Sequence, residues 1–266
     1  MTPGASRTDA TTVFVHAHPD DEAIFTGGTM ARLIDAGKRV TLVVATGGEL
    51  GAVHPEVAAE VASPTELAAL RREECLRAAA ELGCDDVRFL GYHDSGMAGD
   101  PANDAPGSFW RTPLEVTARR LAGLLDELRA TAVVGYDDHG IYHHPDHVMT
   151  TRVVVAAASL ARTPTVYGAT VDREHLHFVE THVVEEAILA GDLGLARSRL
   201  GVSSVEVDVT TNVAATLDRK RRALAAHASQ IPDSASALTL PAEHFAQVYG
   251  LEWYTRSGPP GPIDAL

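Results

Sequence analysis

Residues 12–45 read TVFVHAHPDDEAIFTGGTMARLIDAGKRVTLVVA, and the order of elements in this stretch decides the fold. Thr12–Ala17 and Arg39–Ala45 are rich in β-branched residues, which favour strands. Ile24–Ala36 lies between them, shows helical spacing of its apolar residues and ends at Gly37, a residue type common just after helices. The stretch therefore predicts a strand, a helix and a second strand, the unit from which parallel sheets are built.

The same alternation continues along the chain. Further strands are predicted at Val87–Leu90, Thr131–Tyr136, Thr165–Val171 and Val202–Val209, and further helices at Ser63–Leu82, Thr112–Leu128, Val148–Leu160 and Asn212–Ser229. This order predicts an α/β fold, Rossmann-like, with a mainly parallel sheet and helices on both faces. We expect a flexible N-terminus over 1–11, a single domain over 12–256 and a flexible tail over 257–266, which is rich in Gly and Pro.

Two of the predicted helices have clear starting signals. Ser63-Pro-Thr-Glu66 and Thr112-Pro-Leu-Glu115 each combine a capping hydroxyl, a proline at the first helical position and a glutamate for a capping box. In the first of these helices Cys75 shares one face with Ala78, Ala79 and Leu82. We therefore interpret Cys75 as a small buried apolar residue rather than a reactive thiol.

Composition narrows the possible classes of function. The chain has 266 residues, of which 45% are hydrophobic and 22% charged, and its formal net charge of −14 repels nucleic acid and anionic membrane surfaces. Two cysteines are too few for a disulfide framework. Met1–Thr12 lacks the basic and apolar parts of a targeting segment, and no run reaches the roughly 18 apolar residues of a membrane span. We expect a cytoplasmic protein without nucleic-acid or membrane partners. The sequence does not decide whether the protein forms a homo-oligomer.

Two His/Asp clusters stand where a parallel sheet places its ligands. His16-Ala-His-Pro-Asp-Asp-Glu22 follows the first strand, and Tyr142-His-His-Pro-Asp-His147 follows the fourth. Ligands bind beyond the carboxyl ends of such strands, and two unusually long connections, Thr46–Ala62 and Gly91–Arg111, also follow strands. Imidazole and carboxylate are ligands for Zn²⁺, and a catalytic zinc site uses three of them. The two clusters therefore predict a metal site, which Fe²⁺ could also occupy.

The first cluster suggests a division of roles between adjacent carboxylates. His18 and Asp21 can face one ion across the turn that follows the strand, while Asp20 points elsewhere and can act as base on water activated by the metal. In the alternative interpretation, Asp20, Asp21 and Glu22 only complement the N-terminus of the next helix. In the second cluster an Asp two residues after His144 can hold that imidazole in one tautomer, whereas His143 has the character of a surface histidine.

Ala17-His-Pro-Asp-Asp-Glu22 and His144-Pro-Asp-His147 resemble the paired signatures of the zinc-dependent PIG-L/LmbE-like de-N-acetylases. The resemblance covers about residues 12 to 255. Further blocks are similar to the actinobacterial branch, which includes mycothiol-pathway deacetylases and amidases: Thr46-Gly-Gly-Glu-Leu-Gly51, the helix with Arg71 and Glu74, Leu90-Gly-Tyr-His-Asp-Ser-Gly-Met-Ala-Gly99, and Arg222-Ala-Leu-Ala-Ala-His-Ala-Ser-Gln230. One departure is His139-Gly-Ile-Tyr-His143, where the family commonly has Asn-Gly-Gly-Tyr-Gly, and it predicts a bulkier wall beside the metal.

The resemblance implies a role for each residue of the two motifs. It makes His18, Asp21 and His147 the zinc ligands. It makes Asp20 the general base. His144, which we expect Asp146 to hold as a cation, would stabilise charge and protonate the leaving amine, and Tyr142 would help to hold the oxyanion. Glu49, Arg71 and Asp94 would grip sugar hydroxyls, although Arg71 could instead lie on a solvated helix face.

The function expected from this resemblance is hydrolysis of an N-acetyl group from an N-acylated amino sugar, such as a GlcNAc conjugate, with release of acetate and a free amine. One alternative is an amidase that removes a larger acyl group from a glucosamine-containing conjugate. Another is a zinc- or sugar-binding module without turnover, which would need neither Asp20 nor His144. A dinucleotide binder is disfavoured, because Gly47-Gly-Glu-Leu-Gly51 lacks the G-x-G-x-x-G spacing.

Overall fold

The computed structural model describes residues 11–58, 61–182, 200–231 and 235–266, and their strands form one seven-stranded sheet. The strands are β1 (Thr11–His16), β2 (Arg39–Thr46), β3 (Asp86–Tyr92), β4 (Ala130–Tyr136), β5 (Thr165–Thr170), β6 (Val209–Asn212) and β7 (Leu251–Ser257). Their order across the sheet is β3-β2-β1-β4-β5-β7-β6. β1 to β5 pair in parallel, while β7 pairs antiparallel with β5 and with β6. The predicted α/β class with a mainly parallel sheet is confirmed.

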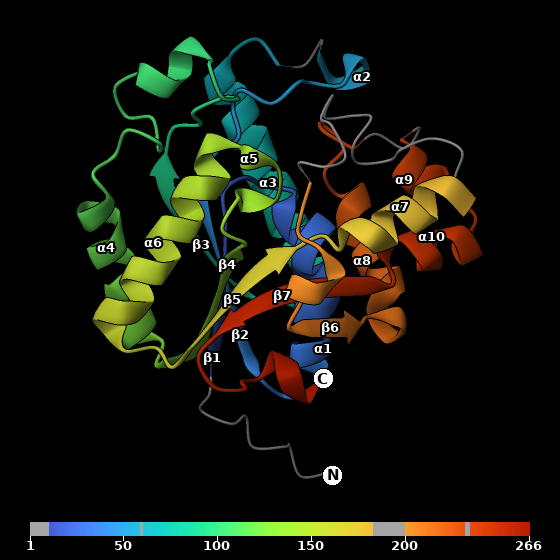
Figure 1. Cartoon of the computed structure of the whole chain (residues 1–266). Coiled ribbons are helices and arrows are strands. Elements are labelled where there is room, and N and C mark those ends of the chain that lie inside the picture. Colours follow the sequence, from blue (N-terminus) through green and yellow to red (C-terminus); the bar gives the residue numbers. More distant parts are fainter. Residues whose placement is uncertain (1–10, 59–60, 183–199, 232–234) are drawn as a thin grey trace, which may run out of the picture.

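Helices pack on both faces of this sheet (Figure 1). They are α1 (Gly27–Asp35), α2 (Pro55–Ala58), α3 (Pro64–Leu82), α4 (Leu114–Glu127), α5 (Gly140–His143), α6 (Pro145–Ala161), α7 (Arg173–His182), α8 (Leu217–Ala225), α9 (Ser236–Thr239) and α10 (Ala242–Tyr249). Successive side chains of β1 point to opposite faces, so Phe14 packs with α1, α3 and α8, whereas Val13 and Val15 pack with α4 and α6. None of the described helices is long and apolar enough to cross a membrane.

The predicted start and end of α3 are confirmed in most details. The Ser63 hydroxyl accepts a hydrogen bond from the Glu66 N–H at 3.3 Å, and Gly83 ends the helix at φ +81°. The Glu66 carboxylate accepts the N–H of Ala62 rather than that of Ser63, so the capping box is shifted by one residue. Cys75 is fully buried and free, as interpreted from its helix face.

The expected cap of α4 is wrong. This helix begins after Pro113, and the Thr112 hydroxyl donates to the carbonyl of Ser108 instead of accepting from the helix. The preceding loop therefore occupies the side chain that the sequence pattern assigned to the cap.

Two elements predicted near the end of the chain are also wrong. Only Val209 of the expected strand 202–209 belongs to β6, because Ser204–Glu206 forms a 3₁₀ turn in which the Ser203 N–H donates to the Glu206 carboxylate at 3.1 Å. The expected helix 212–229 is shorter. It follows a 3₁₀ turn at Ala214–Thr216 and ends at Ala225, after which His227 turns inward to a buried carboxylate.

The segment expected to be a flexible tail packs against the sheet. Its first residue, Ser257, ends β7, a strand that the sequence did not predict. Ile263 is 1% exposed, the Tyr167 hydroxyl donates to Asp264 at 2.5 Å, and Arg256 forms an ion pair with the same carboxylate. The other expected flexible segment, 1–11, lies outside the described residues except for Thr11, which begins β1.

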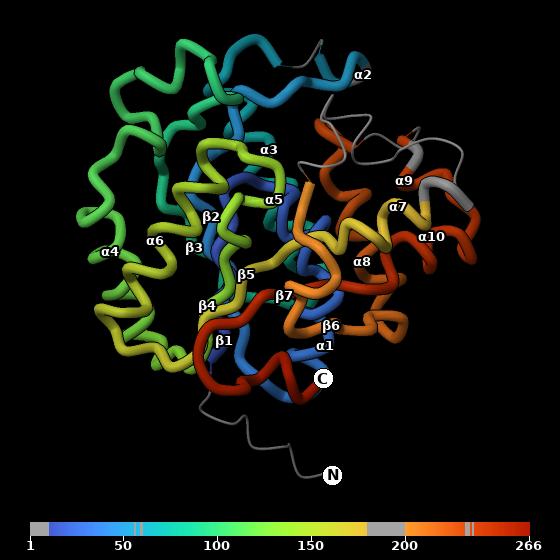
Figure 2. Tube along the Cα trace, in the orientation of Figure 1, coloured from blue at the N-terminus to red at the C-terminus, as the bar shows by residue number. Residues whose placement is uncertain are grey.

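The carboxyl ends of β1, β2, β3 and β4 lie at one edge of the sheet. Figure 2 shows the long connections after β2 and β3 near the top of the molecule. They lie at the carboxyl edge of the sheet, where α5 also lies. The first connection contains α2, and the second contains a 3₁₀ turn at Pro101–Asp104. Both His/Asp clusters therefore lie at this edge, where a parallel sheet places its ligands.

Candidate active site

His18, Asp21 and His147 converge at the carboxyl edge of the sheet. His18 follows β1, Asp21 precedes a π-helical turn at Glu22–Thr26, and His147 lies in the first turn of α6. The Nδ1 atom of His18 lies 3.5 Å from Asp21 Oδ2 and 3.3 Å from His147 Nε2. His147 Nε2 in turn lies 3.4 Å from Asp21 Oδ2, and all three side chains are buried.

This donor set fits a metal ion. A tetrahedral ion with bonds of about 2.0–2.1 Å separates its ligand atoms by about 3.4 Å, which matches the three distances. Two imidazoles and one carboxylate with an open fourth position are also the ligand types of a catalytic zinc site. The three residues that the sequence proposed as ligands are therefore brought together with ligand atoms within one coordination sphere.

Neighbouring side chains fix the orientation of these ligands. His18 Nε2 donates to Asp146 Oδ2 at 3.3 Å, which leaves Nδ1 as the atom with a free lone pair. The Tyr136 hydroxyl donates to Asp21 Oδ2 at 2.7 Å, and the Tyr136 ring stacks on His147 with centroids 4.2 Å apart. The sequence analysis gave Tyr136 no role. The only signal in the sequence was its position at the end of a predicted strand, just before the second cluster.

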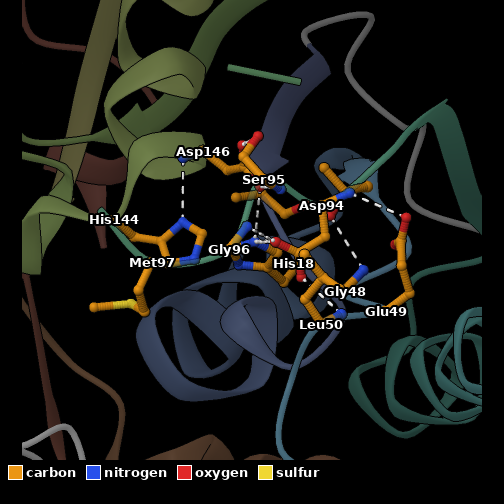
Figure 3. Close-up of polar contacts among 12 residues, drawn as sticks. His18, Gly48, Glu49, Leu50, Asp94, Ser95, Gly96, Met97, His144 and Asp146 are labelled. Carbon is orange, nitrogen blue, oxygen red and sulfur yellow. Dashed lines mark hydrogen bonds and ion pairs between the residues drawn. The ribbon is translucent and has the colours of Figure 1, made fainter. Parts of the chain in front are cut away.

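The Asp146 carboxylate does not have its expected partner. It accepts the backbone N–H of Ser95 at 2.9 Å and the Ser95 hydroxyl, besides His18. The contact with His144 comes from the backbone N–H of Asp146, which donates to His144 Nδ1 at 3.1 Å (Figure 3). The expectation that the carboxylate orients His144 is therefore wrong, and Asp146 orients the ligand His18 instead.

His144 is neutral in this geometry. Its Nδ1 caps α6 by accepting the N–H of Asp146, so the ring proton is on Nε2. Burial lowers the pKa of His144 to about 2, and the neighbouring imidazoles of His18 and His147 act in the same direction. A metal ion beside it would lower this pKa further. The expected cation is therefore wrong, and His144 can offer its Nε2–H as a hydrogen-bond donor.

Asp20 has an unusual backbone conformation, with φ at +111°. Its N–H donates to Glu22 Oε2 at 3.0 Å, and its Oδ2 accepts a hydrogen bond from Arg71 Nη2 at 3.0 Å. Burial raises the pKa of Asp20 to about 6, Arg71 lowers it, and the Asp21 charge raises it. As predicted, the two adjacent carboxylates point apart, with Asp21 toward the histidines and Asp20 toward a pocket.

The pocket beside these groups has a volume of about 430 Å³, which suits a small-molecule ligand. Its lining residues come from both clusters, from the two long connections, from α3 and from the segment after α8. They are His18, Asp20, Leu50, Gly51, Ala52, Arg71, Asp94, Gly96, Met97, Tyr142, His144 and Gln230. Gln230 is a lining residue to which the sequence analysis gave no role, although it closes the last block of the resemblance.

Tyr142 brings a hydroxyl to the inner end of this pocket. The hydroxyl lies 3.2 Å from His147 Nε2, beside the three candidate ligand atoms. Burial, followed by the nearby charges of Asp21 and Asp20, raises the pKa of Tyr142 well above its usual value. The phenol therefore keeps its proton near neutral pH and can donate a hydrogen bond.

Asp94 and Glu49 differ in how they meet the pocket. Asp94 lines it and accepts N–H groups from Gly96 at 2.8 Å and Leu50 at 3.3 Å. Glu49 lies behind Asp94, and its Oε1 accepts the Asp94 N–H at 3.1 Å (Figure 3). The same oxygen lies 2.9 Å from His93 Nδ1. Glu49 therefore joins the two long connections to each other, and Asp94 presents the carboxylate to the pocket.

Arg71 is buried, at 3% exposure, so its alternative interpretation as a solvated helix residue is wrong. Its guanidinium donates to the carbonyls of Gly48, at 2.5 Å, and Pro19, and to the Asp20 carboxylate. These bonds tie α3 to the loops after β1 and β2. Arg71 thus holds Asp20 in place, besides lining the pocket.

We expect Arg71→Ala to lower both stability and kcat. The substitution removes three hydrogen bonds of a charged group, each commonly worth roughly 1.5–3 kcal/mol of unfolding free energy, and Asp20 would lose a partner. Denaturant unfolding and steady-state kinetics measure the two effects. Arg72→Ala is the control, because Arg72 is exposed on the same helix and lies over the Phe89 ring at 4.0 Å. If Arg71→Ala instead raises KM and leaves stability and kcat unchanged, Arg71 only binds the substrate and does not hold Asp20.

The loop 139–143 does not form the bulky wall that the sequence predicted. Ile141 and His143 have φ values of +63° and +67°, and the Asp137 carboxylate accepts the N–H groups of His139 and Ile141, each at 2.9 Å. The Ile141 side chain is fully buried in an apolar cluster, and among the described residues only Tyr142 of this loop lines the pocket. Two left-handed residues without glycine cost about 1–2 kcal/mol each, which Asp137 helps to offset.

The chain is similar to known proteins in sequence and in fold. The family model described as PIG-L, GlcNAc-PI de-N-acetylase, matches residues 13–158. A 1D-myo-inositol 2-acetamido-2-deoxy-alpha-D-glucopyranoside deacetylase from Thermomonospora curvata is 38% identical, over 98% of this chain and 95% of its own. A deacetylase of the same name from Thermobifida fusca is 36% identical, over 96% and 95%. The N,N'-diacetylchitobiose deacetylase from Pyrococcus horikoshii has a similar fold, with a TM-score of 0.60 and 22% identity over 93% of this chain and 84% of that one.

Proposed function

The chain belongs to the PIG-L family of de-N-acetylases, and we propose that it hydrolyses the N-acetyl group of an amino-sugar conjugate to release acetate and a free amine. The observation that carries this proposal is the set of three ligand atoms 3.3–3.5 Å apart, beside a pocket that Asp20 also lines. A site for a Lewis-acidic ion and a carboxylate that can accept a proton are what amide hydrolysis requires.

We propose that His18, Asp21 and His147 hold Zn²⁺, with Fe²⁺ as the alternative, and that the ion supplies the Lewis acidity that polarises the amide carbonyl and acidifies water. Asp20 accepts a proton from the water whose oxygen bonds to the carbonyl carbon. The Nε2–H of His144 and the hydroxyl of Tyr142 donate hydrogen bonds to the oxygen that gains negative charge.

The second half of the reaction follows from the neutral state of His144. A neutral imidazole is a poor acid, so His144 is not suited to protonate the leaving nitrogen. Asp20 then holds the proton taken from water and delivers it to the nitrogen as the carbon–nitrogen bond breaks. One carboxyl group therefore serves as base and then as acid, and the immediate products are acetic acid and the amine. The acid then ionises to acetate, and the released proton can be taken up by the amine.

The curated relatives are named for a substrate in which GlcNAc is joined to inositol, and we propose a conjugate of this class for the chain. The pocket volume of about 430 Å³ supports a ligand larger than a single acetamide. Asp94 and Arg71 line it as candidate contacts for sugar hydroxyls, and Glu49 supports Asp94 from behind. A cytoplasmic location remains part of the proposal, supported by the two free, buried thiols Cys75 and Cys84.

A substrate screen tests the proposal against the amidase alternative. Metal-loaded protein is incubated with a GlcNAc–inositol conjugate, with free GlcNAc and with a cysteinyl-glucosamine–inositol conjugate, and products are quantified by mass spectrometry. We expect acetate release from the GlcNAc–inositol conjugate to have the highest kcat/KM. Faster release of the cysteinyl group would show that the protein is an amidase. If the metal-loaded protein hydrolyses none of these amides, the alternative of a binding module without turnover is favoured.

A further inference from the structure

A buried ion pair lies directly behind Asp20. His227 Nε2 and Glu22 Oε1 are 2.6 Å apart, and both side chains have 0% exposure. The other oxygen of the same carboxylate, Oε2, accepts the backbone N–H of Asp20 at 3.0 Å. Three groups are therefore linked in sequence, from the imidazole of His227 through the Glu22 carboxylate to the backbone of Asp20.

The backbone of Asp20 needs such support. A φ of +111° is rare for a residue with a side chain, and it persists only where surrounding bonds impose it. The carbonyl of Asp20 accepts the N–H groups of Ala23 and Ile24, each at 3.0 Å, and Glu22 takes the N–H. Without Glu22 in place, the Asp20 N–H would lose its acceptor, and the peptide could rotate to an ordinary conformation.

The position of His227 is itself fixed. Ser229, two residues later, donates its N–H and hydroxyl to Glu74 of α3 at 2.8 and 2.6 Å. Within the described residues His227 Nδ1 has no hydrogen-bond partner, so the hydrogen bond to Glu22 is the one that the ring makes. The bonds between Ser229 and Glu74 therefore fix the chain next to His227, and the imidazole of His227 has the Glu22 carboxylate as its one hydrogen-bond partner among the described residues.

Stability alone explains this pair poorly. A buried ion pair is costly to desolvate, and apolar residues of similar size often stabilise a fold equally well. We propose that His227 is a positioning residue, which acts through Glu22 to hold Asp20 in the conformation that brings its carboxylate to the pocket. This inference rests on the proposed role of Asp20 as base.

The chain offers a matched control for the test. Lys220 and Glu252 form a second buried ion pair, 2.6 Å apart with 1% exposure on each side. The Glu252 carboxylate accepts the N–H groups of Gly28 and Thr29 in the first turn of α1 rather than that of Asp20. Loss of either pair should lower stability, but only loss of the first should disturb Asp20.

The experiment compares His227→Leu, His227→Gln and Lys220→Met as metal-loaded proteins, with kcat, KM, metal content and unfolding measured for each. We expect His227→Leu to lower kcat roughly 10–100-fold, because a misplaced catalytic group loses that order of rate, with metal content and KM nearly unchanged. His227→Gln, whose amide can donate to Glu22, should recover most of the loss. Lys220→Met should lose stability and keep its kcat.

Several results would overturn the inference. A wild-type kcat in metal-loaded His227→Leu would do so, as would equal losses of kcat in His227→Leu and Lys220→Met. If the wild-type protein releases no acetate, the proposed function fails. The inference about His227 can still be tested by a crystal structure of His227→Leu, or of His227→Gln if His227→Leu does not fold. An Asp20 φ near +111° and an unmoved carboxylate in His227→Leu, or a displaced Asp20 in His227→Gln, would contradict it.

Discussion

His18→Ala is expected to remove the bound metal and abolish turnover. His18 supplies one of the three ligand atoms that we propose, 3.3 Å from His147 Nε2 and 3.5 Å from Asp21 Oδ2. Two remaining ligands hold a catalytic ion poorly, and the substitution also deprives the Asp146 carboxylate of its imidazole donor. Elemental analysis of the purified variant after dialysis measures the metal, and acetate release measures the activity.

A second histidine substitution separates ligand loss from general damage. His244 lies on α10, which contacts α7 and β7, and is outside the pocket lining. His244→Ala should therefore keep one ion per chain and the wild-type kcat. Full metal content in His18→Ala would show that the ion is bound by other residues, and the assignment of His18, Asp21 and His147 would then be withdrawn.

The strands that the sequence predicted well are those with a local signal. β1, β2, β4 and β5 are short runs rich in β-branched residues, and β3 contains a short run with apolar residues between two helices. These patterns do not depend on distant parts of the chain. β7 has no such pattern and forms by pairing with β5, whose paired residues lie 83–91 positions earlier in the chain. Its antiparallel addition also brings Asp264 to Tyr167 and Arg256, which packs a Gly- and Pro-rich segment that composition alone marks as flexible.

The site shows the same limit at the level of atoms. The ligand residues could be predicted because two His/Asp clusters follow strands that end at the same edge of a parallel sheet. Which atom of Asp146 meets His144 depends on the start of α6, where the imidazole caps the helix, and residue spacing does not reveal this. The Glu22–His227 pair joins residues 205 positions apart, and no local sequence pattern predicts such a contact.

Asp20→Asn is expected to lower kcat by roughly 10²–10⁴, the usual contribution of a general base, while metal content and KM stay close to those of the wild type. Asparagine has the same shape, and its carbonyl oxygen can still accept the hydrogen bond from Arg71. It cannot accept a proton from water. Asp138→Asn is the control, since Asp138 is an exposed carboxylate in the loop after β4. Kinetics with the GlcNAc–inositol conjugate and elemental analysis provide the measurements.

The outcome also tests how His227 acts. If His227 works only by holding the Asp20 carboxylate, its substitution has little left to change once that carboxylate is an amide. The double variant Asp20→Asn/His227→Leu should then be nearly as active as Asp20→Asn alone, and the two losses should not multiply. Multiplied losses would mean that His227 affects the reaction by another route. Metal loss in Asp20→Asn would make Asp20 a ligand, and an unchanged kcat would remove it from the mechanism.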